Sequence, residues 1–156
     1  MTRRMYFSYS FFLVYDSGDV NPVFDWQDVH VAQGFARSQT SACFRSMLEF
    51  GDAEVDVVIG AYESRSDHVR VIEVPLKIDS GVVAVEGPED FGEGLRFEVG
   101  AGSWLVTAAQ TADSERIDLF FERTSTLRQF SRVIVGDEEL SPMYPLAEYC
   151  PPIELA

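Results

Sequence analysis

Hydrophobic and polar residues alternate along most of this chain, which is the pattern of β-strands with one buried face. Glu54 and Asp56 alternate with small and branched apolar residues in 53–57, so both acids are expected on the solvent side of a half-buried strand. The segments that predict strands are 6–15, 40–45, 53–62, 68–78, 82–86, 95–99, 104–109, 117–122 and 132–135. Short strands with turn residues between them predict an all-β fold, an antiparallel β-sandwich or an open barrel.

Turn and breaker residues refine this picture. Asp79-Ser80-Gly81 separates two predicted strands and indicates a tight hairpin between them. Pro75 lies within the predicted strand 68–78 and, because proline cannot donate to the ladder, indicates a sheet edge or a bulge.

One segment has a helical pattern instead. Residues 25–34 predict a short helix near 26–33, with Asp25 as its N-cap, Asp28 in its first turn and Gly34 just past its end. Residues 124–130 predict a second helical turn, and the proline-rich tail 142–156 is expected to be an extended strap over the core. Because no linker or internal repeat interrupts the pattern, 1–156 is predicted to be a single domain.

The charge balance excludes some classes of partner. The 156 residues contain 26 Asp and Glu against 12 Lys and Arg, a formal net charge of −14. Nucleic acids and anionic membranes are bound through lysine and arginine, so neither is expected as a direct partner. The basic and apolar start of the chain lacks a small-x-small cleavage site, and Cys43 and Cys150 form no C-x-x-C pair. We therefore expect a cytoplasmic protein with both thiols reduced.

The residues that carry catalysis or bind metals do not form a recognisable constellation. The sequence contains no P-loop, no H-E-x-x-H and no G-x-S-x-G, and its two histidines, His30 and His68, are expected to be solvent-facing or packed. The acids of 16–19 have a turn composition, and those of 52–56 share one strand face. We expect no enzyme activity, no metal site and no cofactor.

Acidic residues concentrate in loops and in the tail. One group surrounds a Gly-Pro loop with Arg96 as its basic neighbour, and a second follows Arg132, after which the chain has no further Lys or Arg. A partner can reach such segments, although solubility alone is an alternative explanation. The residues predicted to bind a partner are Glu86, Glu89, Asp90, Glu93, Asp137, Glu138 and Glu139.

The N-terminal quarter of the chain resembles a known family. Residues 7–15 and 22–36 are similar to the signature of the competence protein J (ComJ) family, a strand of the type S-Y-x-x-F-x-V followed by D-W-T-D-E-x-x-x-x-G-F/Y. A looser pattern, L-x-F-x-V-x-x-G-x-W-L-V-T, continues the resemblance at 95–107. The motif residues are expected to be structural, with Trp26 as a core anchor; they are Asp25, Trp26, Asp28 and Gly34.

The resemblance implies a function that needs no catalytic residues. Members of this family are known as inhibitors of a DNA-entry nuclease, which implies a basic nuclease as the partner. An acidic surface that occupies phosphate sites fits that role and speeds the encounter by electrostatic steering.

Two departures from the family pattern keep alternatives open. Gln27 stands where the pattern has Thr, and the tail after Arg132 is longer than expected. One alternative is an immunity protein that neutralises a different secreted toxin. Another is a small-ligand or carbohydrate-binding sandwich that stacks its ligand on Trp104 or on a Tyr and Phe cluster.

Overall fold

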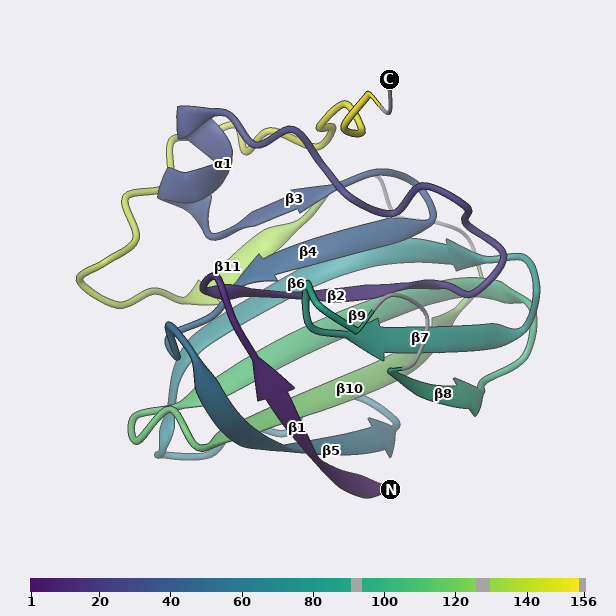
Figure 1. Cartoon of the computed structure of the whole chain (residues 1–156), viewed down its shortest axis with the longest axis horizontal. Coiled ribbons are helices and arrows are strands. Elements are labelled where there is room, and N and C mark those ends of the chain that lie inside the picture. Colours follow the sequence, from purple (N-terminus) through teal and green to yellow (C-terminus); the bar gives the residue numbers. More distant parts are fainter. Residues whose placement is uncertain (91–93, 126–129, 155–156) are drawn as a thin grey trace.

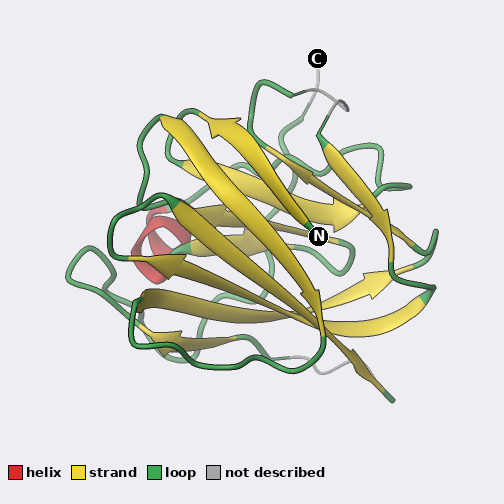
Figure 2. Cartoon of the chain, turned by 90° about the horizontal axis from the view of Figure 1, so that it is seen from below, coloured by secondary structure: helices red, strands yellow, loops and turns green. Residues whose placement is uncertain are grey.

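Two β-sheets pack face to face in the computed structural model, which describes residues 1–90, 94–125 and 130–154 (Figure 1). Sheet A has the strand order β1 (Thr2–Phe7), β5 (Gly51–Ile59), β10 (Arg116–Thr124), β9 (Gly102–Thr111), β6 (His68–Ile78) and β11 (Arg132–Val135). Sheet B has the order β3 (Phe35–Arg37), β4 (Ser41–Arg45), β2 (Phe11–Asp16), β7 (Val82–Glu86) and β8 (Leu95–Glu98). Figure 2 shows the strands as two layers, with helix α1 (Asp28–Gln33) to one side.

The core lies between the two sheets. Alternate residues of each strand point inward, so that Phe12 of β2, Leu76 of β6 and Phe121 of β10 are completely buried in one cluster. Phe12 stacks on Phe44 at 5.4 Å between ring centroids. The prediction of an all-β fold with one short helix is confirmed.

One ladder departs from the antiparallel prediction. β10 pairs with β5 in parallel, with Ile117 opposite Val55, whereas the other ladders among the described residues are antiparallel. The chain reaches β10 by a turn from β9, and β5 already pairs on its far side with β1. The parallel pair therefore joins two segments that are far apart in sequence and carry no local turn signal.

The predicted strand 6–15 is wrong as a single element. Tyr9 and Ser10 adopt positive φ angles of 58° and 59°, which ends β1 in sheet A and starts β2 in sheet B. Backbone hydrogen bonds hold this corner, because Ser10 donates to the carbonyl of Glu49 and accepts from the N–H of Ser46. The alternating aromatic residues concealed a change of sheet.

The predicted hairpin at 79–81 is also wrong. β6 lies in sheet A and β7 in sheet B, so Asp79-Ser80-Gly81 carries the chain between the sheets. The carboxylate of Asp16 accepts hydrogen bonds from the N–H of Asp79 at 2.9 Å and from the hydroxyl of Ser80. Pro75 lies just past the ladder of β6 with β11, which matches the edge position predicted for it.

Helix α1 (Asp28–Gln33) begins two residues later than predicted. Gln27, not Asp25, is its N-cap, and Gly34 ends it with φ 88°, as predicted. Asp25 instead uses its backbone, whose N–H donates to the carbonyl of Pro151 and whose carbonyl accepts from the thiol of Cys150. Of the second helical turn predicted at 124–130, Thr124 belongs to β10 and residues 126–129 lie outside the described part of the chain.

The C-terminal segment, residues 136–154, lies along β3 and α1 after β11 ends (Figure 1). The N–H of Cys150 donates to the carbonyl of Arg37 at 2.9 Å, on the free edge of β3. Gln33 of α1 bonds both the carbonyl and the N–H of Ala147 at 2.9 Å. The segment thereby covers a strand edge that would otherwise present unpaired backbone groups.

Candidate partner-binding surface

The outer face of sheet A carries acids that meet basic side chains of the same strand or of other strands of the sheet. Asp118 of β10 lies 2.8 Å from Nε2 of His68 and accepts from Nε of Arg116 at 2.7 Å. Arg116 also donates to Asp56 of β5 at 3.1 Å, and Glu73 of β6 accepts from Arg132 at 3.2 Å. These acids on the outer face of sheet A therefore serve the fold, because their carboxylates are paired with basic side chains of the same sheet.

The acids of 52–56 do lie on this outer face, as the alternation predicted. Asp52 is 3.7 Å from Arg4, and Asp56 and Glu54 both face Arg116. No group of three His, Cys, Asp or Glu side chains among the described residues is arranged to hold a metal ion. Nor is any described helix long and apolar enough to cross a membrane.

Both histidines are buried and hydrogen-bonded. His30 accepts at Nδ1 from the N–H of Gln27 at 3.0 Å, so its Nε2 carries the proton and donates to the carbonyl of Tyr149 at 3.2 Å. His68 lies between the hydroxyl of Tyr62 and Asp118, and burial next to Asp118 raises the pKa of Tyr62. The sequence left two possibilities for these histidines, packed or solvent-facing, and the structure shows that both are packed.

The first group of acids predicted to bind a partner is only partly exposed. Glu86 is buried, with 4% exposure, and its carboxylate is 3.4 Å from Arg96. Asp90 turns back on its own loop and accepts from the N–H of Gly87 at 2.6 Å, whereas Glu89 is exposed. Glu93 lies outside the described residues.

The second predicted group is engaged with arginines of the body. The completely buried Arg70 donates through Nε and Nη2 to the two carboxylate oxygens of Asp137, at 3.0 Å each. Glu139 is 3.5 Å from Arg45, and farther along the segment Glu148 is 3.2 Å from Arg37. Glu138 is exposed. Asp137 and Glu139 therefore anchor the C-terminal segment.

The outer face of sheet B is partly covered by two segments of the chain. Residues 22–26 and 149–153 pack over it and form a second hydrophobic cluster, which includes Tyr15, Phe24, Cys43 and Cys150. Burial raises the pKa of the Cys43 thiol well above its usual value and that of Cys150 to about 11. Both cysteines are free, and β3 lies between their backbones.

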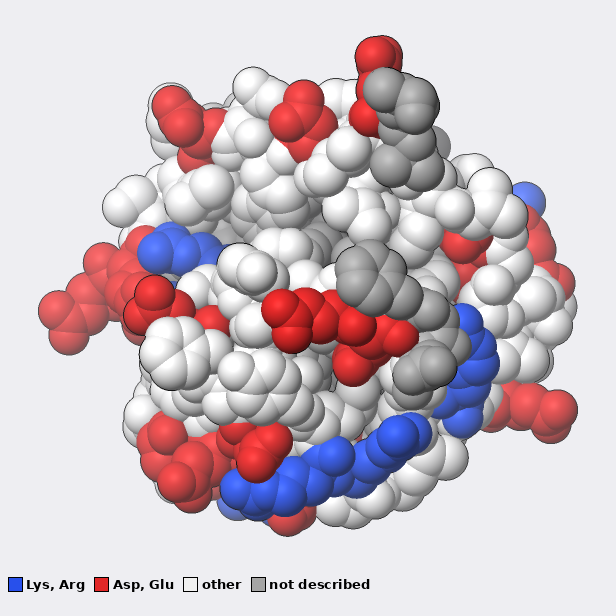
Figure 3. Space-filling model, viewed as in Figure 1, with Lys and Arg blue, Asp and Glu red and all other residues white. Residues whose placement is uncertain are grey.

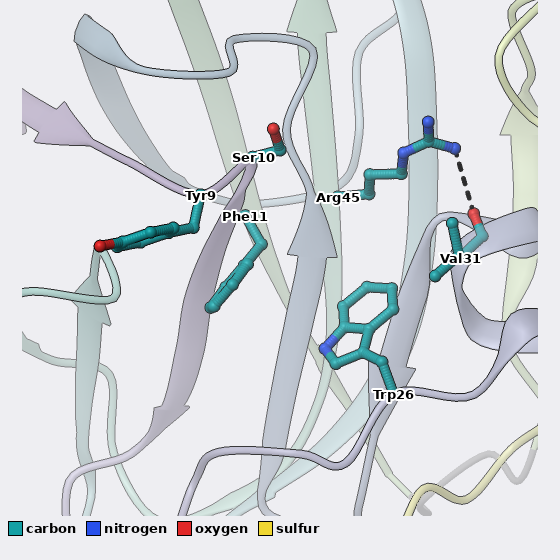
Figure 4. A pocket seen from close by; sticks show the side chains of 6 residues that line it. All are labelled: Tyr9, Ser10, Phe11, Trp26, Val31 and Arg45. Carbon is teal, nitrogen blue, oxygen red and sulfur yellow. Dashed lines mark hydrogen bonds between the residues drawn. The ribbon is translucent and has the colours of Figure 1, made fainter.

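An apolar hollow opens where this cover ends (Figure 4). Its volume is about 330 Å³. Its walls come from the corner before β2, from β2, from the segment before α1, from α1 and from β4. The lining residues are Tyr9, Ser10, Phe11, Trp26, Val31 and Arg45. Trp26 is half-buried and packs on Phe11 and His30, so the predicted anchor also forms a wall of a surface hollow. Sequence analysis did not find this hollow.

Trp104, the alternative stacking platform, is buried. Its exposure is 3%, Arg123 lies over its ring at 4.8 Å, and its indole N–H donates to the carbonyl of Gly100. A carbohydrate ring cannot stack on this side chain. The view in Figure 3 shows acidic side chains in separate groups, with a band of basic side chains along the lower edge.

Comparison with known proteins identifies the family. A family model described as competence protein J (ComJ) matches residues 4–128. The chain belongs to the ComJ family. The crystal structure of ComJ from Bacillus subtilis, described as an inhibitor of the DNA degrading activity of NucA, has the same fold, with a TM-score of 0.69 at 16% sequence identity. The similarity covers 80% of this chain and 96% of the Bacillus protein, while no curated protein matches the sequence.

The ComJ match separates the candidate surfaces. The apolar hollow lies entirely within residues 4–128, as does Glu89. β11, the C-terminal segment and the acids 137–139 lie beyond the matched residues. The hollow is therefore part of the family domain, whereas the second predicted acidic group belongs to an addition to it.

Proposed function

We propose that this ComJ-family protein inhibits a DNA-degrading nuclease by binding to it and catalyses no reaction itself. The observation that carries this proposal is the family match over residues 4–128, together with the shared fold of a ComJ described as an inhibitor of NucA. The site geometry supports it, because the two histidines and most of the buried acids are committed to internal hydrogen bonds.

The inhibition proceeds through acidic side chains that compete with DNA for the basic cleft of the nuclease. A nuclease neutralises DNA phosphates with lysine and arginine, and a chain with a net charge of −14 is attracted to the same groups. Glu89 and Glu138 are exposed members of the two predicted acidic groups, and unlike the exposed Glu139 they face no arginine among the described residues, so they contribute mainly to the rate of encounter. The reduced, buried thiols Cys43 and Cys150 fit a cytoplasmic protein.

Cleavage of a fluorogenic DNA duplex tests the proposal. The purified protein is titrated into NucA of Bacillus subtilis and into the NucA-like nuclease of the organism that carries this chain. We expect stoichiometric inhibition of at least one nuclease, and weaker inhibition at high salt. Full cleavage by both at micromolar excess of the protein in low salt contradicts the function.

Paired substitutions test the acidic mechanism. The double variant Glu89→Ser with Glu138→Ser is expected to slow association severalfold, because both side chains are exposed. The control is Glu115→Ser with Glu122→Ser, which changes the net charge equally at other exposed positions. Equal association rates of the two double variants contradict a role for these two acids.

A second candidate is an immunity protein against a different secreted toxin. The C-terminal segment beyond residue 128 favours it, since this addition changes the surface next to the hollow. If the protein inhibits a toxin encoded next to its own gene but inhibits neither nuclease, the result favours the immunity protein over the nuclease inhibitor.

A further inference from the structure

The apolar hollow beside Trp26 is built from exposed apolar side chains. Tyr9 is 69% exposed and Val31 43% exposed, and the aromatic rings of Phe11 and Trp26 form the rest of the apolar wall. An exposed apolar site of this kind, inside the family domain, marks a contact surface rather than a feature of the fold.

The walls of the hollow are held in place before any partner binds. Trp26 packs on Phe11 at 6.5 Å between ring centroids and meets His30 edge-on at 6.4 Å. The guanidinium of Arg45 donates to the carbonyls of Val31 at 3.2 Å and Glu139 at 3.0 Å, which fixes the wall opposite (Figure 4). A partner therefore pays little to order this surface.

Four acidic residues form an acidic border next to the residues that line the hollow. Asp25 directly precedes Trp26, and Asp28 is one helical turn before Val31, which places it on the same side of α1. Both acids are exposed and, within the described residues, neither carboxylate has a hydrogen-bond or ion-pair partner.

Two further acids complete this border. The carbonyl of Glu49 accepts the N–H of Ser10, and the Glu49 side chain is exposed beside that corner. The carboxylate of Glu139 is 3.5 Å from Arg45 and is more than half exposed. The hollow thus has a largely apolar lining, four acids beside its lining residues, and one cation, Arg45, that is already engaged.

We infer that this hollow is the centre of the nuclease interface and receives an apolar side chain that lies next to lysine or arginine on the nuclease. This inference rests on the proposed function and names the part of the surface that performs it. The apolar side chain provides buried area in the hollow, and the neighbouring cations meet the acidic border. The acids alone would attract the nuclease, whereas the hollow fixes where it docks.

Other occupants fit less well. A second copy of this chain carries the same net charge of −14, so two acidic borders would repel each other. A small polar ligand fits less well because the lining of the hollow is largely apolar and offers few polar groups for a specific site.

The substitution Val31→Arg tests the inference by placing bulk and positive charge in the hollow. We expect the dissociation constant of the complex with the inhibited nuclease to rise by about thirtyfold or more, as at the centre of an interface. The matched control is Val58→Arg, since Val58 is 36% exposed on the outer face of sheet A, and we expect its effect to stay within about threefold. Tyr9→Asn is the second variant, because asparagine tolerates the positive φ at position 9.

Fluorine NMR of the full chain labelled with 5-fluorotryptophan gives a readout that is independent of inhibition. The chain has two tryptophans, and only the Trp26 signal, not that of the buried Trp104, is expected to shift when the nuclease is added. A Trp26 signal that stays fixed in the complex, or that shifts on raising the concentration of this protein alone, overturns the inference. The inference is also overturned if the Val31→Arg and Tyr9→Asn variants are folded and still bind the nuclease as tightly as the wild type. If the wild-type protein inhibits neither nuclease, the proposed function has failed instead.

Discussion

The outer faces of the two sheets use acidic residues in opposite ways. On sheet A, Arg116 meets Asp118 on its own strand and Asp56 on the adjacent strand β5, and Glu73 meets Arg132. Around the hollow on sheet B, Asp25 and Asp28 are exposed, and no described residue pairs with their carboxylates. The net charge of −14 is therefore not one property of the surface: part of it stabilises the fold, and part is free to act on a partner.

The difference teaches where a charge count is informative. An acid that lies opposite an arginine across a ladder contributes to stability. The two opposite charges of the pair also cancel much of each other's long-range field. Acids beside an apolar hollow keep their field and add to it a place to dock. The following variants separate these two roles.

The largest effect is expected at Asp118. Its buried carboxylate bonds the buried His68 and also Arg116, so Asp118→Ala removes the acidic partner of a buried side chain and is expected to lower the free energy of unfolding by about 3–5 kcal/mol. Urea denaturation measures the loss. Any variant that remains folded should bind the nuclease with unchanged affinity, and a large loss of affinity in a folded Asp118→Ala protein would assign sheet A to the interface.

Asp16 is an acid of sheet B that serves the fold. Burial alone would raise its pKa, but hydrogen bonds from the Ser80 hydroxyl and from the N–H groups of Asp79 and Gly18 lower it below the usual range. We expect Asp16→Asn to cost about 1–3 kcal/mol at pH 7. A depressed folded-state pKa gives stability above the unfolded value of about 3.9 and loses it as the pH falls through the folded value.

The pH dependence is the check on Asp16. The difference in unfolding free energy between wild type and Asp16→Asn should shrink as the pH falls below about 4. If this difference in unfolding free energy stays constant from pH 7 to pH 2.5, the charge of the Asp16 carboxylate does not contribute to stability.

The acids around the hollow are expected to affect binding more than stability. The triple variant of Asp25, Asp28 and Glu49 to Ser should slow association with the nuclease about tenfold at low salt, because border charges act mainly on encounter. The control triple, Glu63, Glu115 and Glu122 to Ser, has the same net charge and is expected to lose much less. Stopped-flow measurements at two salt concentrations compare them, and equal losses would mean that net charge alone directs the encounter.

The smallest effect is expected at the thiols beneath the cover of sheet B. Burial raises the pKa of Cys150 to about 11 and that of Cys43 well above its usual value, so neither thiol should react with a disulfide reagent at pH 8 in the native protein. Both should react after denaturation. Rapid labelling of Cys150 in the folded state would mean that the C-terminal segment detaches and that the cover is not permanent.

Local patterns predicted most strands, because a period of two in the sequence maps directly onto a half-buried strand. The positive φ angles of Tyr9 and Ser10 left no trace in that pattern, since alternating aromatic residues suit either sheet. The same applies to the parallel pairing of β5 with β10, which joins distant segments.

The site was predictable only in part. The motif drew attention to Trp26 and to its acidic neighbours, and the charge pattern singled out Glu89 and Glu138, whose role in binding stays a prediction. The hollow itself joins Tyr9, Val31 and Arg45 from separate elements, so only the tertiary fold assembles it. Nothing in the sequence near Arg70 indicates its ion pair with Asp137, which is 67 residues away in the chain. Nothing near Arg45 indicates its hydrogen bond to the carbonyl of Glu139, which is 94 residues away.

Hydrogen–deuterium exchange of the wild-type protein with and without the inhibited nuclease tests the central claim most directly. If the outer face of sheet B around the hollow is the interface, residues 9–11 and 25–31 become protected in the complex, while β5 and β10 on sheet A exchange as before. Protection confined to β5 and β10, with none at the hollow, would contradict this account.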